Sequence, residues 1–156
     1  MHRLVTGLAI AALAVITAAV APSAQETGAI AVEAPWTRAT PPGAPTAAGF
    51  LVLRNTGESE DRLVGARSPA AGTVEVHEMA MEDGVMRMRH LTDGLAVPPG
   101  GSVTLEPGGY HLMFMDLAAP FEAGGTVTVT LEFERAGERA VTLPVAPIGA
   151  REAPAE

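Results

Sequence analysis

The stretch TVTVTLEFERAGERAVTLPV, residues 126–145, decides the fold class. From residue 127 to residue 133 every second side chain is Val, Leu or Phe, and the side chains between them are Thr or Glu. Because successive side chains of a strand point to opposite faces, this alternation indicates a strand with one buried and one exposed face. The Ala-Gly-Glu sequence at 136–138 then turns the chain back into a second strand over 139–145.

The rest of the chain repeats this pattern of short apolar segments between Gly- and Pro-rich turns, and no segment shows a sustained helical period. Turn signals at such regular spacing are typical of an antiparallel sandwich or barrel. With 156 residues the chain is long enough for one domain with a sizeable core. We therefore predict an all-β fold, an antiparallel β-sandwich or barrel, with strands at 29–32, 47–54, 62–66, 73–81, 85–90, 103–105, 110–117, 126–135 and 139–145.

The first residues are typical of a secretory signal peptide. Arg3 gives a short positive region, an uncharged Ala-rich run covers residues 4–20, and small residues follow. We expect residues 1–24 to be this signal peptide, cleaved between residues 19 and 24. An uncleaved membrane anchor is the alternative, but the run is near the lower length limit for spanning and is rich in Ala rather than Leu. No later segment of the sequence is apolar and long enough to span a bilayer.

Cysteine content and charge exclude several classes of function. The chain has no cysteine, although export would place it in an oxidising environment. Blue-copper electron-transfer sites and zinc sites built on cysteine are therefore excluded. The net charge is −8, and removal of Arg3 makes it one unit more negative. This charge argues against nucleic acid and anionic membrane surfaces as partners.

The histidines and methionines concentrate in one window. Six of the seven methionines and three of the four histidines lie between His77 and Met115. Thioether sulfur and imidazole nitrogen together suit copper, above all Cu(I). The alternative is that the methionines fill a core, but core methionines would be scattered over all the strands. Strands outside the window use Val, Leu and Phe instead, so the window predicts a copper site.

Asp83 and Gly84 predict a tight β-hairpin inside this window, because a type I′ turn needs positive φ at both central positions. The turn fixes the register of the two strands, and alternation then puts every sulfur and imidazole of the hairpin on one face. On the opposite face Glu78 meets Arg89 as a pair of opposite charges. On the shared face the expected pairs are Met81 with Met86, Met79 with Met88, and His77 with His90.

The segment YHLMFM, residues 110–115, supplies the second half of the window. Leu112 and Phe114 share one face of a strand and make a natural core pair. His111 and Met113 share the other face, where residues i and i+2 lie side by side within reach of one ion.

These residues resemble the periplasmic PCu(A)C copper chaperones, and the resemblance covers nearly all of the mature domain. Ten residues separate a His from a Met, and 22 residues separate that Met from a His-x-Met pair, as in the family pattern. Further similarity lies in APWTR at 34–38, DRL at 61–63, HEM at 77–79, GVMRMR at 84–89 and PGGYHLM at 107–113. The resemblance implies that Cu(I) is bound by His77, Met88, His111 and Met113.

The resemblance also implies a cupredoxin-like Greek-key fold, a periplasmic location and delivery of copper for assembly of the CuA centre of cytochrome c oxidase. The acceptor would be oxidase subunit II or another copper chaperone. We expect the chaperone domain to span 25–146, to be a monomer, and to be followed by a disordered tail over 147–156. This tail has neither His nor Met, unlike the copper-binding tails of some relatives.

The other chemistry-bearing residues of the window have simpler interpretations. We expect His90 to be a surface residue, the acidic residues to form a solvated surface, and the remaining methionines to form an apolar collar around the ion. No Ser/His/Asp arrangement and no phosphate-binding loop is present, so we predict that the protein is not an enzyme. The competing hypothesis is a metal-free β-sandwich that binds a protein partner through a Met-rich patch. The acidic residues are Glu75, Glu78, Glu82 and Asp83; the collar is Met79, Met81, Met86 and Met115.

Overall fold

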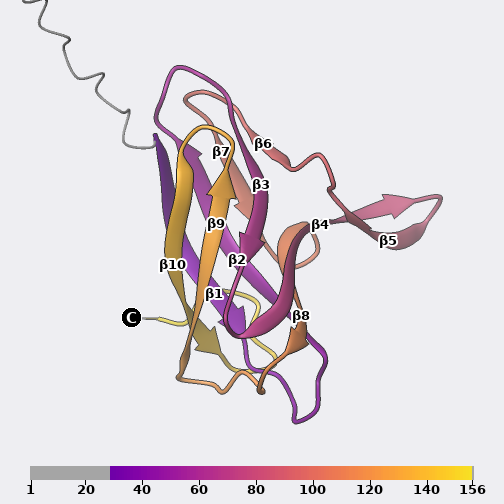
Figure 1. The fold of residues 1–156 in the computed structure, drawn as a ribbon. Coiled ribbons are helices and arrows are strands. Elements are labelled where there is room, and N and C mark those ends of the chain that lie inside the picture. Colours follow the sequence, from indigo (N-terminus) through magenta and orange to yellow (C-terminus); the bar gives the residue numbers. More distant parts are fainter. Residues whose placement is uncertain (1–28, 156) are drawn as a thin grey trace, which may run out of the picture.

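The computed structural model describes residues 29–155, which form ten strands and no helix (Figure 1). The all-β prediction is confirmed. The expected signal peptide, residues 1–24, lies outside the described residues. Within residues 29–155 no helix is long and apolar enough to cross a membrane. The strands are β1 (Ile30–Arg38), β2 (Thr46–Asn55), β3 (Asp61–Arg67), β4 (Ala71–Glu82), β5 (Val85–His90), β6 (Leu95–Val97), β7 (Ser102–Leu105), β8 (Tyr110–Leu117), β9 (Thr126–Phe133) and β10 (Gly137–Ala146).

Eight of the strands close into a barrel in the order β4-β8-β7-β2-β1-β10-β9-β3. The barrel closes where β3 returns to β4 through the pair Ala66 and Val74. Most neighbours are antiparallel, as predicted, but β1 runs parallel to β10 and β7 runs parallel to β8. The remaining strands extend the sheet, β5 from β4 and β6 from β3. The short strand β6 was not predicted, since three residues are too few to show an alternation.

The core fixes which face of β4 and β8 points outward. Val74 and Val76 of β4, and Leu112 and Phe114 of β8, are buried in the barrel interior. The alternate residues of both strands therefore lie on the outer surface. Burying each of these side chains stabilises the fold by about 1.5–3 kcal/mol, and a one-residue slip would expose them all, so the outward face is strongly specified.

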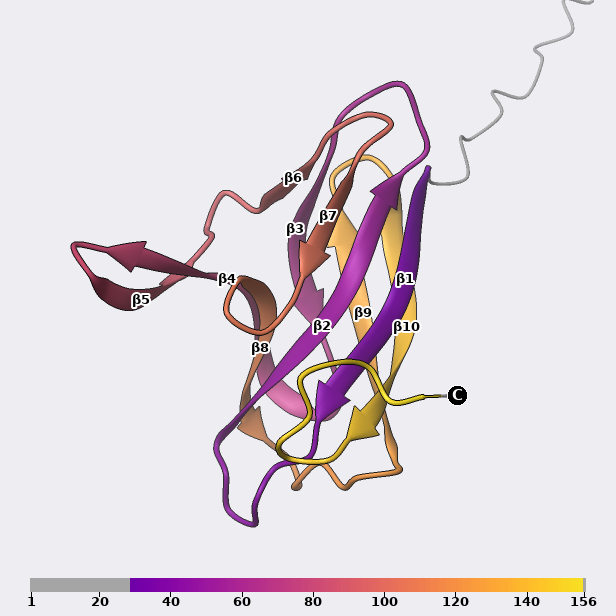
Figure 2. The ribbon, with the colours of Figure 1, turned by 180° about the vertical axis from the view of Figure 1, so that it is seen from behind.

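The hairpin of β4 and β5 projects sideways from the barrel (Figures 1 and 2). Asp83 and Gly84 have φ angles of 50° and 79°, as a type I′ turn requires. The register matches the sequence prediction, with Met79 opposite Met88 and Glu78 opposite Arg89. All six residues of β5 are exposed, so the hairpin depends on its turn and on β4 rather than on the core.

The segment after β10 lies against the outer face of β1 and β2 (Figure 2). We expected disorder over 147–156. Residues 147–155 contain no strand, but Ala150 packs against the buried rings of Trp36 and Phe50. The Nε atom of Arg38 also donates a hydrogen bond to the carbonyl oxygen of Ala150, at 2.6 Å. These contacts give the segment a defined path over the β1 and β2 surface.

The Gly84→Val variant should loosen the hairpin and leave the barrel intact. A β-branched residue at this positive φ is strained by about 1–3 kcal/mol, whereas a Cβ atom at residue 84 would meet no atom within 4 Å. Amide hydrogen exchange of β5 should accelerate about tenfold or more, because 1.4 kcal/mol is a factor of ten. The amides of β9 provide the internal control, and their exchange should not change. Equal loss of protection in β5 and β9 would show that the hairpin is part of the barrel's cooperative unit.

Candidate metal centre

Three histidines form a row across the neighbouring strands β5, β4 and β8, which we call the histidine row. His77 of β4 pairs with His90 of β5 on one side and with His111 of β8 on the other. The ring centroids of His77 and His90 are 5.4 Å apart with the planes inclined by 20°, and those of His77 and His111 are 5.8 Å apart, inclined by 53°. The row lies where β4 passes from its pairing with β8 in the barrel to its pairing with β5 in the hairpin.

The two ring nitrogens of His77 have different environments. Nε2 lies 2.8 Å from Oε2 of Glu75, and the side chain of His77 is only 13% exposed. Because an ionised carboxylate can only accept, Nε2 carries the hydrogen of the neutral ring and Nδ1 keeps a lone pair. Nδ1 is buried and has no hydrogen-bond partner among residues 29–155. A buried polar atom without a partner costs about 1–3 kcal/mol, which a metal bound at Nδ1 would offset.

His111 is held in a similar way by a backbone oxygen. Its Nδ1 lies 3.1 Å from the carbonyl oxygen of Gly109, which also accepts the N–H of Met79 at 3.0 Å. A carbonyl oxygen only accepts, so Nδ1 is the donor and Nε2 keeps the lone pair. Burial lowers the pKa of His111, which is 5% exposed, and nearby His77 lowers it further, against the opposing effect of the hydrogen bond. The ring is therefore held in the neutral form that binds metals.

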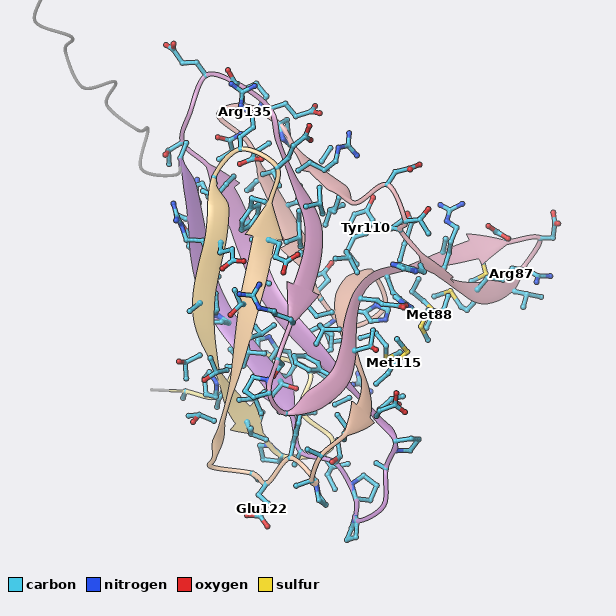
Figure 3. All side chains as sticks on the ribbon, viewed as in Figure 1. Arg87, Met88, Tyr110, Met115, Glu122 and Arg135 are labelled. Carbon is cyan, nitrogen blue, oxygen red and sulfur yellow. The ribbon has the colours of Figure 1, made fainter. Side chains whose placement is uncertain are left out.

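The sulfur atoms of the expected site come from two different strands. Met113 lies opposite Glu75 in the pairing of β8 with β4, and it shares the outward face of β8 with His111. Met88 is 46% exposed on the hairpin, opposite Met79. In Figure 3 the labelled Met88 and Met115 lie on the side from which the hairpin leaves the barrel.

The structure thus brings three of the four expected ligands together on adjacent strands of the barrel, namely His77, His111 and Met113. Met88 shares their face only through strand alternation along the hairpin. It lies opposite Met79 and two residues from His90, on the same face of the hairpin.

The structure places Glu75 and His90 at this site, although the sequence analysis assigned both to the surface. Glu75 was expected to be solvated surface, yet its Oε2 contacts Nε2 of His77 and lies 3.4 Å from Nδ1 of His90. His90 was expected to be a surface residue; it is exposed, but it belongs to the histidine row. The signal was present in the sequence, because strand alternation places Glu75 beside His77 and the hairpin register places His90 opposite it.

Comparison with known proteins gives consistent matches over the whole barrel. The family model for LpqE-like putative lipoproteins matches residues 30–145. The putative lipoprotein Lxx21020 of Leifsonia xyli subsp. xyli is 36% identical over 116 residues, which cover 74% of this chain and 69% of that protein.

Solved structures add copper-bound proteins to these matches. The copper-bound PCuAC domain from PmoF2 has a TM-score of 0.65 at 30% identity, over 78% of this chain and 95% of that domain. The solution structure of Cu(I)-DR1885 from Deinococcus radiodurans has a TM-score of 0.58 at 27% identity, over 80% of this chain and 81% of that one.

The hydrogen bonds of the histidine row predict opposite tautomers for two neighbouring rings. In the metal-free protein at neutral pH, His77 should carry its hydrogen on Nε2 and His111 on Nδ1. Long-range ¹H–¹⁵N correlation spectra of the imidazoles distinguish the two forms directly. In the Glu75→Gln variant the preference of His77 for the Nε2–H tautomer should weaken, because the amide oxygen accepts less strongly than a carboxylate. The Nδ1–H tautomer of His111 should persist. Identical tautomers in the parent protein would contradict this description of the site.

Proposed function

The chain belongs to the LpqE-like family, the family of PCu(A)C copper chaperones, and on this premise we propose that it binds one Cu(I) ion reversibly and passes it to an acceptor protein. The resemblance seen in the sequence is confirmed at the level of the family, which is a chaperone family and not an enzyme family. Its barrel is cupredoxin-like, as the resemblance implied.

We assign the Cu(I) ligands to His77, His111, Met113 and Met88. The observation that carries this assignment is the paired orientation of the two histidines. Each has one ring nitrogen committed to an oxygen acceptor and the other nitrogen left with its lone pair. This is the arrangement in which metal-binding histidines are normally held, because the second hydrogen bond fixes both the tautomer and the direction of the ring.

The ligand chemistry fits a carrier better than a permanent cofactor site. Thioether and imidazole are neutral donors that suit Cu(I), and the thioether does not compete with protons. His111 is buried at the barrel, whereas Met88 stands half-exposed on β5, a strand that contributes no residue to the core. A ligand on such an element can be displaced by a ligand of the acceptor without disturbing the fold.

The proposal also includes a cellular location and an acceptor protein, which membership of the family does not establish. We place the protein in the periplasm, where the signal-like residues 1–24 would deliver it; the similar protein from Leifsonia is named a putative lipoprotein, which supports export. The acceptor that we propose is the CuA domain of cytochrome c oxidase subunit II. Another copper chaperone is the alternative acceptor.

Removal of single ligands should weaken Cu(I) binding without unfolding the protein. Met113→Leu nearly conserves volume, a change that usually costs less than about 1.5 kcal/mol of stability, but it removes a sulfur donor. His111→Gln removes an imidazole. In competition with a chromophoric Cu(I) chelator, the parent should bind one equivalent, and each variant should bind at least about tenfold more weakly, a loss of about 1.4 kcal/mol.

Met81→Leu is the matched control for these variants, because Met81 lies near the hairpin turn and is 63% exposed. Its affinity should equal that of the parent. Cu(I) should raise the melting temperature of the parent and of this control by mass action, and less so in Met113→Leu and His111→Gln. If the parent binds no Cu(I), the competing hypothesis of a metal-free module with a Met-rich docking patch stands instead.

Transfer to the proposed acceptor is a separate expectation. Cu(I)-loaded protein mixed with the metal-free CuA domain should lose its copper to that domain, as measured by metal analysis after the two proteins are separated. Met88→Leu should speed this release, because the remaining donors hold the ion less firmly. Retention of all the copper with an excess of acceptor would exclude this acceptor and leave Cu(I) binding untouched.

A further inference from the structure

We infer that Glu75, His77 and His90 form a second metal site, for a divalent transition-metal ion, with Cu(II) bound more tightly than Zn(II). The site lies at the base of the hairpin and takes only oxygen and nitrogen donors. It does not depend on the proposed Cu(I) function, apart from the competition for His77 described below.

The geometry is already close to that of a bound ion. One ligand atom from each of the three side chains lies within 4.8 Å of the other two. Oε2 of Glu75 lies 2.8 Å from Nε2 of His77 and 3.4 Å from Nδ1 of His90. Metal–ligand bonds of about 2.0–2.2 Å place neighbouring donors about 3–4 Å apart. Small side-chain rotations would therefore suffice to admit an ion among these three atoms.

The backbone positions these donors before any ion arrives. Glu75 and His77 are two residues apart on β4, so they project from the same face. His90 is directly opposite His77 in the hairpin, and the two rings stack with an inclination of 20°. The register that brings them together is set by the turn at Asp83 and Gly84. Little conformational entropy then remains to be lost when the ion binds.

The donor set selects the kind of ion. One carboxylate oxygen and two imidazole nitrogens suit borderline divalent ions and contain no soft sulfur for Cu(I). Among such ions Cu(II) stands highest in affinity and Zn(II) follows below it. The carboxylate charge offsets part of the charge of the ion. His90 is exposed, so water can complete the coordination from the open side.

His77 would be shared by both metal sites, and this makes them compete. A neutral imidazole has one lone pair. Cu(I) on Nδ1 needs the hydrogen on Nε2, where it bonds to Glu75. A divalent ion among Glu75, His77 and His90 takes Nε2 instead and leaves the hydrogen on Nδ1. One domain can therefore use His77 for Cu(I) or for a divalent ion, but not for both.

The test uses variants of residues that belong either to the Cu(I) site or to the divalent-metal site, but not to both. The metal-free full-length protein is titrated with Cu(II) and, separately, with Zn(II), and the Cu(II) complex is examined by electron paramagnetic resonance. The parent should bind one equivalent of Cu(II) with hyperfine coupling from two imidazole nitrogens, and Zn(II) more weakly. His90→Gln and Glu75→Gln should each lose at least about tenfold in Cu(II) affinity. Met113→Leu should keep the Cu(II) affinity of the parent.

His90→Gln is the decisive variant, because His90 belongs to the divalent set alone. Its Cu(I) affinity should equal that of the parent. Arg87→Gln is the matched control, since Arg87 is an exposed residue of the same strand that points away from the site, and it should bind both ions normally. Prior loading with Zn(II) should weaken Cu(I) binding in the parent and in Arg87→Gln, but not in His90→Gln.

Three results would overturn the inference: no binding of a divalent ion by the parent, unchanged Cu(II) affinity in His90→Gln, or a Cu(II) complex without imidazole nitrogen. A parent that binds Cu(II) through two imidazoles but fails to bind Cu(I) would support this site while removing the proposed function. A parent that binds Cu(I) but no divalent ion would support the proposed function and remove the divalent-metal site. The two proposals therefore fail independently.

Discussion

The pairing of β4 with two different partners is the constraint on which the rest of the site depends. The first part of β4 pairs with β8 inside the barrel, and the last part pairs with β5 outside it. His77 and Glu78 stand at the overlap and pair with both neighbours. Because alternation turns Val76 into the core, His77 must face outward at this point. The histidine row exists because β5 and β8 each present a histidine to that position.

The hydrogen bonds around the histidine row fix one nitrogen of His77 and of His111 and leave the other nitrogen of each ring with its lone pair. Glu75 and the carbonyl of Gly109 each take one imidazole hydrogen, and each bond leaves the opposite nitrogen of its ring as a donor to metal. These two hydrogen bonds cost the metal-free protein little free energy, since they form whether or not Cu(I) is bound to the opposite nitrogens. The Nδ1 atom of His77, which has no hydrogen-bond partner within residues 29–155, is the exception, and ion binding would recover the free energy lost by leaving it unpaired. The metal-free fold is therefore already arranged for binding, which suits a protein that must load and release its cargo repeatedly.

The sequence predicted the local half of this site and missed the long-range half. The turn at Asp83 and Gly84 determined the hairpin register without any tertiary information, and the apolar pair Leu112 and Phe114 determined the outward face of β8. The pairing of His77 with His111 could not be derived in this way. It joins strands that are far apart in sequence, and no turn residue between them sets its register.

The other omissions have similarly physical causes. The parallel pairing of β1 with β10 also joins distant segments, and it leaves no mark on the alternation of either strand. The role of Glu75 was missed because a carboxylate at a polar position of a strand is most often solvated. Its contact with His77 follows from alternation, but alternation alone does not distinguish an orienting acceptor from a surface charge.

Exposure along the site falls steadily from the hairpin to the barrel, and this order bears on how an ion would exchange. Met81 is 63% exposed and Met88 46%, whereas the side chain of His77 is 13% exposed and His111 5%. Flexible, polarizable thioethers thus stand outermost, and rigid, oriented imidazoles lie beneath them. An incoming ligand from a partner meets the sulfur first, so exchange under the proposed function would begin at Met88 and end at His111. The strand that carries Met88 contributes nothing to the core. For this reason, Met88, the ligand that would be displaced first under the proposed function, is also the one whose movement costs the fold least.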